Sequence, residues 1–370
     1  MRVPSLFACL PGLSPQSLFQ SADKPHSLLG VPEKPLPPPP PSVEVLPSKD
    51  AQSDKYVAEP VNLRGGLTLL KSRVNTMDIF GVPYLDLVPG KYEGGLKLWE
   101  SSLDLVNTLK REIQDGQLSF RGKRVLELGC GNGLPGIFAC LKGASTVHFQ
   151  DFNAEVLRCL TIPNVYVNLQ NARERLGRHC DGPVTPTRTT TLSPDVHFYA
   201  GDWGDLHTLL SVVEQDQLGA CDINLSFSED DLFLDRSLSH NSSGVNQETQ
   251  IDSSHGRQIT RTRKLSGSRA CERANDMDPS EGGYDIILMA ETVYSLVSMR
   301  KLYGLIKKCL RPPYGVVYLA AKKHSFCGGG GGTRQFRSIV EENGILGAHL
   351  VVEVADGSSN IREIWKFFYK

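Results

Sequence analysis

Short apolar runs recur along the chain, and between them apolar residues return at helical spacing. Continuous runs of this kind suit strands that are buried on both faces of a parallel sheet. We expect strands at 124–128, 146–152, 197–202, 285–290, 315–321, 349–354 and 363–369. We expect helices late in 91–109 and at 206–213, 297–310 and 333–342. This alternation predicts an α/β fold with a doubly wound, mostly parallel sheet.

Several stretches break the alternation. Residues 1–58 include an unbroken run of five prolines, which predicts an extended, disordered, proline-rich region. The segment at about 216–283 is polar and aperiodic, so we expect a disordered insertion there. A shorter polar excursion spans 171–194. The remaining part, 59–370, is predicted to form one α/β domain, which opens with short strands within 56–87.

Composition narrows the class of protein. A formal net charge of -1 over 370 residues argues against a protein that coats nucleic acid. No apolar run reaches the roughly 18 residues of a membrane helix, and prolines interrupt the first apolar stretch, so we expect neither a membrane span nor a signal peptide. The nine cysteines form no Cys-x-x-Cys pair. We therefore expect reduced intracellular thiols and no metal site.

The most informative stretch is Glu127-Leu128-Gly129-Cys130-Gly131-Asn132-Gly133, which joins a predicted strand to an apolar helix. Glycines at alternate positions let the backbone approach a bound nucleoside. Gly136 extends the run into the dinucleotide fingerprint as well, but the strand has already ended at Leu128. An acidic residue ahead of the first glycine suits a cationic amino-acid ligand better than a pyrophosphate. The loop thus predicts an S-adenosylmethionine site that uses Glu127, Gly129, Gly131 and Gly133.

Acidic and aromatic residues follow the next two strands. Asp151 lies about twenty residues past the loop, where nucleoside-binding folds place a carboxylate that accepts from the ribose. A helix N-cap is the alternative role for Asp151, and Asn153 is another candidate for that cap. Asp202 is placed to accept from the adenine amino group, and Trp203 to cover the ring. The alternative for Trp203 is ordinary burial at the edge of the domain.

Two further acids have candidate roles on the reacting side. Glu291 follows the fourth strand, whose carboxyl end faces the ligand in this class of fold, and is a candidate for orienting the methyl acceptor. A helix-capping role is the alternative. Trp99 is a candidate for packing on the sulfonium cation, as aromatic rings do on ammonium groups, and Glu100 for reaching its amino-acid end. The alternatives are that Trp99 is an ordinary core residue and that Glu100 is a solvent-exposed acid on the helix surface.

Several of these stretches together resemble the eukaryotic protein-histidine methyltransferases that modify a large-subunit ribosomal protein. The resemblance rests on Gly94-Gly95-Leu96-Lys97-Leu98-Trp99-Glu100, on the glycine loop, and on Phe149-Gln150-Asp151-Phe152-Asn153. Further matches are Leu160-Thr161-Ile162-Pro163-Asn164-Val165, Gly201-Asp202-Trp203, Glu291-Thr292-Val293-Tyr294, and Lys323-His324 with the glycine run that follows. The likeness covers residue 78 to the end of the chain, apart from the two polar insertions.

The resemblance implies a Rossmann-like, seven-strand class I methyltransferase fold with one antiparallel strand. It implies S-adenosylmethionine as donor, and transfer to a histidine ring nitrogen, the tele nitrogen, of a large-subunit ribosomal protein. A role in ribosome assembly or translation, a monomer, and a location in the cytoplasm and nucleus, with the nucleolus open, follow in the same way. By residue match, cofactor contacts fall on Leu98, Trp99, Glu100, Ser101, Ser102, Gln150, Asp151, Phe152, Asn153, Gly201, Asp202, Trp203 and Ala290.

One position departs from the family pattern. The family often has Thr-Ser where this chain has Met289-Ala290, so a hydroxyl contact to the cofactor is missing there. Three alternatives stay open at this point: a lysine methyltransferase of the same fold, a nicotinamide-dependent oxidoreductase, and a ribosome-assembly factor that has lost its chemistry.

Overall fold

The computed structural model describes residues 38–47, 58–81, 88, 90–178, 194–213, 282–324, 331–355, 357 and 361–370. Almost all of the predicted insertion and most of the proline-rich region lie outside these residues. No described helix is both long enough and apolar enough to cross a membrane.

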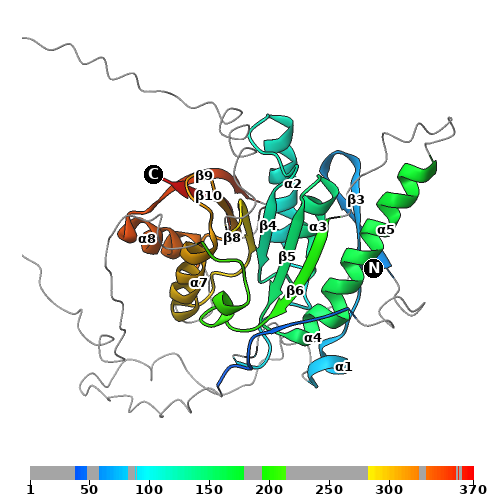
Figure 1. The fold of residues 1–370 in the computed structure, drawn as a ribbon, viewed down its shortest axis with the longest axis horizontal. Coiled ribbons are helices and arrows are strands. Elements are labelled where there is room, and N and C mark those ends of the chain that lie inside the picture. The colour runs from blue at the N-terminus through cyan, green and yellow to red at the C-terminus, as the bar shows by residue number, and fades with distance from the viewer. Residues whose placement is uncertain are drawn as a thin grey trace, which may run out of the picture. The chain divides into compact units, whose positions relative to one another are not determined.

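An eight-stranded sheet organises the described domain, in the order β1-β6-β5-β4-β7-β8-β10-β9 (Figure 1). Its strands are β1 (Val43–Glu44), β4 (Arg124–Leu128), β5 (Thr146–Asp151), β6 (Asp195–Ala200), β7 (Ile286–Ala290), β8 (Val316–Lys322), β9 (Leu346–Val354) and β10 (Arg362–Tyr369). Strands β6, β5, β4, β7 and β8 are parallel, whereas β10 is antiparallel to both β8 and β9. Strand β1 also runs antiparallel, to β6, at the opposite edge. The order of the other seven strands, with the antiparallel β10 between β8 and β9, confirms the expected methyltransferase-type fold.

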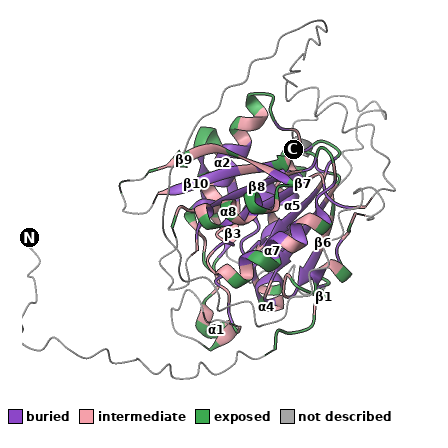
Figure 2. Cartoon of the chain, turned by 90° about the vertical axis from the view of Figure 1, so that its left-hand side faces the viewer, coloured by how far each residue is buried: buried purple, intermediate pink, exposed green. Residues whose placement is uncertain are grey.

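Helices cover both faces of the sheet because its strands are apolar on both faces. In β7, Ile286 and Leu288 pack in one core cluster with α2 (Glu100–Gln114), α3 (Leu134–Leu141) and α5 (Ile162–Arg178). The alternate residues Ile287 and Met289 pack in a second cluster with α7 (Leu296–Cys309) and α8 (Thr333–Asn343). Figure 2 shows the resulting band of buried residues along the central strands. The continuous apolar runs in the sequence therefore mark strands between two layers.

An N-terminal hairpin lies outside the large sheet. Its strands are β2 (Ala58–Leu63) and β3 (Leu67–Ser72), joined by a turn η2 (Arg64–Gly66), and a short helix α1 (Thr76–Phe80) follows. Asn168 of α5 accepts from Leu70 N–H at 2.8 Å and donates to its carbonyl at 2.7 Å. The hairpin is thus fixed to α5 by side-chain hydrogen bonds, which agrees with the short strands expected at 56–87.

Three sequence predictions need correction. Residues 38–47 lie in the region predicted to be disordered, yet β1 pairs with β6, and Val45 N–H donates to Phe198 C=O at 2.7 Å. The helix expected at 206–213 is only the single turn η4 (Leu206–Thr208). The chain leaves helical geometry because Val213 N–H donates to the Lys308 carbonyl of α7 at 2.9 Å instead.

The third correction concerns the polar excursion at 171–194. Its first residues continue α5 as far as Arg178, so this part is helix and not an irregular segment. The helices expected at 297–310 and 333–342 match α7 and α8 within one residue, whereas α2 continues five residues past 109, to Gln114. The start of α2 matters for the site. The helix expected late in 91–109 begins at Glu100, so Trp99 stands just before it as the N-cap residue.

Candidate functional site

A pocket opens at the carboxyl ends of β4, β5, β6 and β7. From β4, the order runs one way to β5 and β6 and the other way to β7 and β8, so the pocket lies at the topological switch point where such folds bind ligands. Its empty volume, counted out to the open mouth, is about 830 Å³. The lining residues from these strand ends are Gly129, Cys130, Gly131, Asn132, Asp151, Phe152, Gly201, Asp202, Trp203, Ala290, Glu291 and Thr292.

The glycine loop forms the floor between β4 and α3. Gly129 and Gly131 adopt φ angles of 61° and 48°, which L-residues with a side chain rarely take. A Cβ at Gly129 would lie 2.7 Å from Thr292 Cγ2, and one at Gly131 would lie 2.7 Å from the Gly95 carbonyl oxygen. Glycine is required at both positions by backbone conformation and by close packing.

Asp151 is a buried carboxylate at the end of β5. It accepts from Gly131 N–H at 3.0 Å and from Asn153 N–H at 3.1 Å. Burial raises its pKa to about 6, against the lowering effect of those hydrogen bonds. Asn153 does not line the pocket; its side chain donates to the Lys91 carbonyl at 2.8 Å and accepts from Glu93 N–H at 3.3 Å. Asn153 therefore fixes the chain that leads to the Gly94-Gly95 turn.

Gln150 joins three strand ends beneath the pocket. Its side-chain oxygen accepts from Gly129 N–H at 3.2 Å and from Trp203 Nε1 at 2.9 Å, and its amide donates to the Gly201 carbonyl at 3.0 Å. Gln150 is fully buried, so it braces the pocket from below. Asp202 lies at the rim, where its carboxylate accepts from Lys301 Nζ at 2.9 Å.

The segment ahead of α2 closes the pocket from another side. Trp99 Nε1 donates to the Gly94 carbonyl at 3.1 Å. Two lysine ammonium groups approach its ring, Lys97 at 4.3 Å and Lys322 at 5.8 Å from the centroid. A ring that attracts these two cations has the face that a sulfonium group also prefers.

Glu291 has the most unusual backbone in the site. Its φ of 56° makes it the one positive-φ residue other than glycine in the described part of the chain. Such a conformation is costly and tends to persist where function needs it. The carboxylate accepts from the Ser101 hydroxyl, and burial raises its pKa. Glu291 is thus held in the pocket wall as a nearly buried acid.

A tyrosine and a glutamate that lie far apart in the sequence meet on the same wall. The Tyr294 hydroxyl donates to Glu93 Oε2 at 2.5 Å, and both residues line the pocket. Burial raises the pKa of Tyr294, so it stays protonated and acts as a donor. Cys130 also lines the pocket, but burial raises the pKa of its thiol and removes it as a nucleophile.

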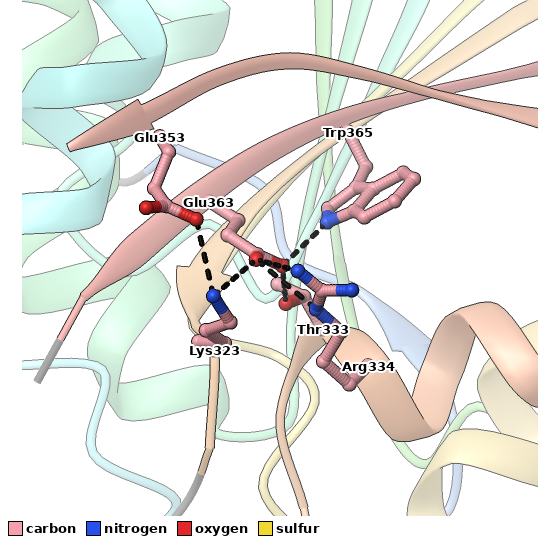
Figure 3. A network of polar contacts seen from close by, with 6 residues as sticks. All are labelled: Lys323, Thr333, Arg334, Glu353, Glu363 and Trp365. Atoms are coloured by element: carbon pink, nitrogen blue, oxygen red, sulfur yellow. Dashed lines mark hydrogen bonds and ion pairs between the residues drawn. The ribbon is translucent and has the colours of Figure 1, made fainter.

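A network of ion pairs and hydrogen bonds is centred on the buried carboxylate of Glu363 (Figure 3). Glu363 of β10 accepts from Thr333 at 2.6 Å, from Trp365 at 2.8 Å and from Arg334 at 2.8 Å. Lys323, which follows β8, lies 3.5 Å from the same carboxylate. The network joins β10, the end of β8 and the start of α8. Next to it, Gly332 N–H donates to the Val293 carbonyl at 2.7 Å and so reaches the wall itself.

The structure brings together most of the residues that the sequence singled out. Leu98, Trp99, Ser102, Gly129, Gly131, Asp151, Phe152, Gly201, Asp202, Trp203, Ala290 and Glu291 all line the pocket. Glu100, Ser101, Glu127, Gly133, Gln150 and Asn153 do not. Glu127 in particular is buried beneath the loop and accepts from Gly136 N–H at 2.7 Å, in the first turn of α3. It serves the helix start, not an open ligand site.

The sequence did not assign several lining residues to the site: Glu93, Gly94, Gly95, Lys97, Cys130, Asn132, Thr292, Tyr294 and Ser298. The Gly94-Gly95 pair and the Glu-x-x-Tyr spacing were visible signals, since both belong to stretches that the resemblance uses. The pairing of Tyr294 with Glu93 spans 201 positions and has no local signal.

The pocket has the shape and the chemistry for a nucleoside joined to an amino acid. Two buried polar atoms of its lining, Asn132 Nδ2 and Thr292 Oγ1, find no hydrogen-bond partner among the described residues. A buried group left unpaired costs about 1–3 kcal/mol, so a ligand that hydrogen-bonds to either atom would recover that cost. No cluster of three metal-ligating side chains occurs in the described part of the chain.

Comparison with known proteins finds similarity to protein methyltransferases. Residues 89–176 match the family model described as lysine methyltransferase. The chain is 31% identical over 279 residues to the histidine protein methyltransferase 1 homolog of Dictyostelium discoideum, covering 75% of this chain and 59% of that protein. It is 28% identical to the homolog of Bos taurus, covering 74% of this chain and 55% of that protein. A third relative, histidine protein methyltransferase 1 of Schizosaccharomyces pombe, is 36% identical over 34% of this chain and 40% of its own length.

The chain thus spans somewhat more than half the length of the first two relatives. Over about 75% of its length, the chain is therefore similar to proteins named histidine protein methyltransferase 1 homolog.

Proposed function

We propose that this protein is an S-adenosylmethionine-dependent protein methyltransferase that modifies a ring nitrogen of histidine. One observation carries the proposal: a glycine-floored pocket at the switch point holds the buried carboxylate of Asp151 on one side and the strained, partly buried Glu291 on the other. Homology to proteins named for histidine methylation supports the choice of acceptor.

The donor is assigned to the side of the pocket formed by β4, β5 and β6. Asp151 accepts from the ribose hydroxyls, and Trp203, held by Gln150, lies along the nucleoside. Asn132 and the glycine backbone contact the amino-acid end. Bound there, S-adenosylmethionine supplies a methyl group already activated by its sulfonium. The protein therefore has to orient the acceptor and exclude water, which can contribute several kcal/mol to the rate.

The acceptor is assigned to the side formed by Glu291, Thr292 and Tyr294. Histidine has an ordinary pKa of about 6.5, so its ring is largely neutral at cellular pH and needs no strong base. One ring nitrogen carries a proton. A carboxylate that accepts a hydrogen bond from this N–H leaves the other nitrogen free to attack the methyl group. Glu291 is the group that we assign to this role, because it is held in the pocket wall by Ser101. The same carboxylate stabilises the positive charge that develops on the ring.

We further propose a large-subunit ribosomal protein as substrate and the tele nitrogen as the site of transfer. These finer assignments rest on the family resemblance of the sequence, as do a role in ribosome assembly or translation and a location in cytoplasm and nucleus. Lysine is the second candidate acceptor, because the family model that matches residues 89–176 is described as lysine methyltransferase.

A labelling experiment separates these candidates. The protein is incubated with methyl-labelled S-adenosylmethionine and either a ribosome-containing or a ribosome-depleted lysate, and labelled amino acids are identified after hydrolysis. The proposal expects tele-methylhistidine from the ribosome-containing lysate. Labelled methyl-lysine would favour the second candidate, and absence of label with bound donor would indicate a protein without catalysis.

A further inference from the structure

A helix beside the glycine loop contains an irregular turn. Helix α4 (Ala154–Val156) runs into a π-type turn, η3 (Leu157–Thr161), and then into α5. Pro163 lies at the second position of α5, where its ring would collide with a carbonyl in a regular helix. The wider π turn accommodates the proline, and turns of this type are frequent at functional sites. The irregularity rotates the residues that follow it.

Two of those residues contact the loop. The Thr161 hydroxyl donates to the Gly131 carbonyl at 2.6 Å, and the Asn164 side-chain amide donates to the Asn132 carbonyl at 3.0 Å. Both side chains are fully buried. The oxygen of the Asn164 side chain also accepts from Ser72 N–H of the hairpin at 2.6 Å. Asn164 thus joins β3, α5 and the loop.

These contacts determine the orientation of two peptide groups in the loop. In a trans peptide the C=O and the next N–H point in opposite directions. With the Gly131 carbonyl held by Thr161, the N–H of Asn132 points away from the helix. With the Asn132 carbonyl held by Asn164, the N–H of Gly133 points away too and donates to the Cys130 carbonyl at 2.7 Å.

We propose that Thr161 and Asn164 form a buried clamp that holds the glycine loop ready for the cofactor. The clamp residues act through Gly131 and Asn132 and touch no ligand, so they are positioning residues. Their effect on affinity comes from pre-organisation, because a loop already in its bound form loses less entropy on binding. This inference rests on the proposed function for the identity of the ligand, but not for the effect on the loop.

Matched substitutions test the clamp. Thr161→Val removes the hydroxyl at constant shape, and Thr161→Ser keeps it. Asn168→Ala is the control, because Asn168 lies on the same helix and holds the hairpin at Leu70 without contacting the loop. For each protein, calorimetry gives the Kd for S-adenosylhomocysteine, and amide hydrogen exchange gives the protection of residues 129–133. Far-UV circular dichroism selects the variants that fold.

We expect Thr161→Val to raise the Kd about tenfold and to speed exchange in the loop, and Thr161→Ser to restore both. Asn168→Ala should lower thermal stability with little change in Kd. Unchanged loop exchange and Kd in a folded Thr161→Val protein would overturn the clamp. If the valine variant does not fold, Asn164→Asp, which keeps the acceptor for Ser72 but loses the donor to Asn132, decides the same question. Wild-type protein that binds no S-adenosylhomocysteine would refute the proposed function. Amide hydrogen exchange of residues 129–133, compared between wild type and Thr161→Val, would still test the clamp.

Discussion

The two sides of the pocket are built differently. On the donor side, the side chains of Gln150, Asp151 and Asn153 form most of their hydrogen bonds with neighbouring backbone groups. The clamp of Thr161 and Asn164 holds the glycine loop as well. On the acceptor side, Glu291 adopts a strained conformation and the Thr292 hydroxyl finds no partner among the described residues. The donor side is thus held mostly by its own hydrogen bonds, with Asn132 Nδ2 as an unpaired exception, whereas the acceptor side combines backbone strain with an unpaired hydroxyl.

This difference indicates how the two substrates are recognised. A side that is braced in advance suits the donor, which is the same molecule in every turnover. A side with an unpaired hydroxyl and a partly buried carboxylate of raised pKa suits a second molecule that completes its hydrogen bonds. Substitutions on the donor side should therefore change cofactor affinity, and substitutions on the acceptor side should change turnover.

The largest effect is expected at Glu291. Glu291→Gln should lower kcat about a hundredfold, because the carboxylate no longer accepts the ring N–H or balances the charge of the product. The Kd for S-adenosylhomocysteine should stay within about twofold, since the donor side is untouched. Steady-state kinetics and calorimetry measure the two quantities. Glu100→Gln is the control, with the same change at an exposed neighbouring position; an equal loss there would contradict the special role of Glu291.

Asp151 should give the next largest effect, on affinity. Asp151→Ala should weaken binding of S-adenosylhomocysteine about tenfold or more, because a buried carboxylate that accepts from the ribose is lost. Calorimetry at pH 7.5 measures the change. An affinity equal to that of the wild type would remove Asp151 from the cofactor site.

The pH dependence sharpens the same prediction. With a pKa of about 6, Asp151 becomes protonated as pH falls, so wild-type affinity should drop as pH falls through that value, and Asp151→Asn should flatten the profile. The raised pKa has the opposite consequence for folding. Its contribution to stability is fully present below the ordinary value of 3.8 and is lost as pH rises through about 6. Protonation of Asp151 therefore does not destabilise the fold at low pH, so a loss of cofactor binding there reports on the binding site itself.

A smaller effect is expected at Trp203. Trp203→Phe keeps an aromatic ring but loses the hydrogen bond to Gln150, so the Kd should rise about threefold. Trp365→Phe is the matched control, because it loses an indole hydrogen bond to Glu363 outside the pocket lining. Fluorescence titration with S-adenosylhomocysteine compares the two. Equal affinity changes would mean that indole hydrogen bonds act only through stability.

The smallest effect on binding is expected at Glu363, although its effect on stability is substantial. Burial alone would raise its pKa, but hydrogen bonds from Thr333, Trp365 and Arg334 outweigh burial and lower it. Glu363→Gln should cost about 1–3 kcal/mol of unfolding free energy, with cofactor Kd unchanged. Urea unfolding measures this loss. Glu353→Gln, which removes a partly exposed partner of Lys323, should cost under about 1 kcal/mol.

The lowered pKa of Glu363 also determines how its contribution to folding stability changes with pH. Its stabilising contribution is present above the ordinary value of 4.5 and is lost as pH falls through the lower, folded-state pKa. The difference in stability between wild type and Glu363→Gln should therefore shrink in strong acid. A difference that grows on acidification would contradict the network.

The sequence predicts the central sheet well because its strands are buried on both faces. The runs at 124–128 and 285–290 correspond to β4 and β7 within one residue. It fails where tertiary contacts decide. Strand β1 has two residues, and pairing with β6 is what makes them a strand. The helix expected at 206–213 gives way to hydrogen bonds with α7 and Tyr284.

The sequence likewise predicts only part of the candidate site. Spacing finds the glycine loop and Asp151, because strand ends of a parallel sheet meet at one edge. Spacing does not tell a residue that lines a pocket from one that braces it. Glu127, which spacing assigns to the cofactor, and Gln150 and Asn153, which the family resemblance assigns to it, do not line the pocket. The positive φ of Glu291 and the pairing of Tyr294 with Glu93 depend on the folded chain.

A crystal structure with bound S-adenosylhomocysteine tests the account most directly. The account predicts the ribose hydroxyls on Asp151, the base beside Trp203, and the sulfur facing Glu291 across the pocket. A ligand bound elsewhere, or one whose sulfur points away from Glu291, would contradict the division of the pocket into a donor side and an acceptor side.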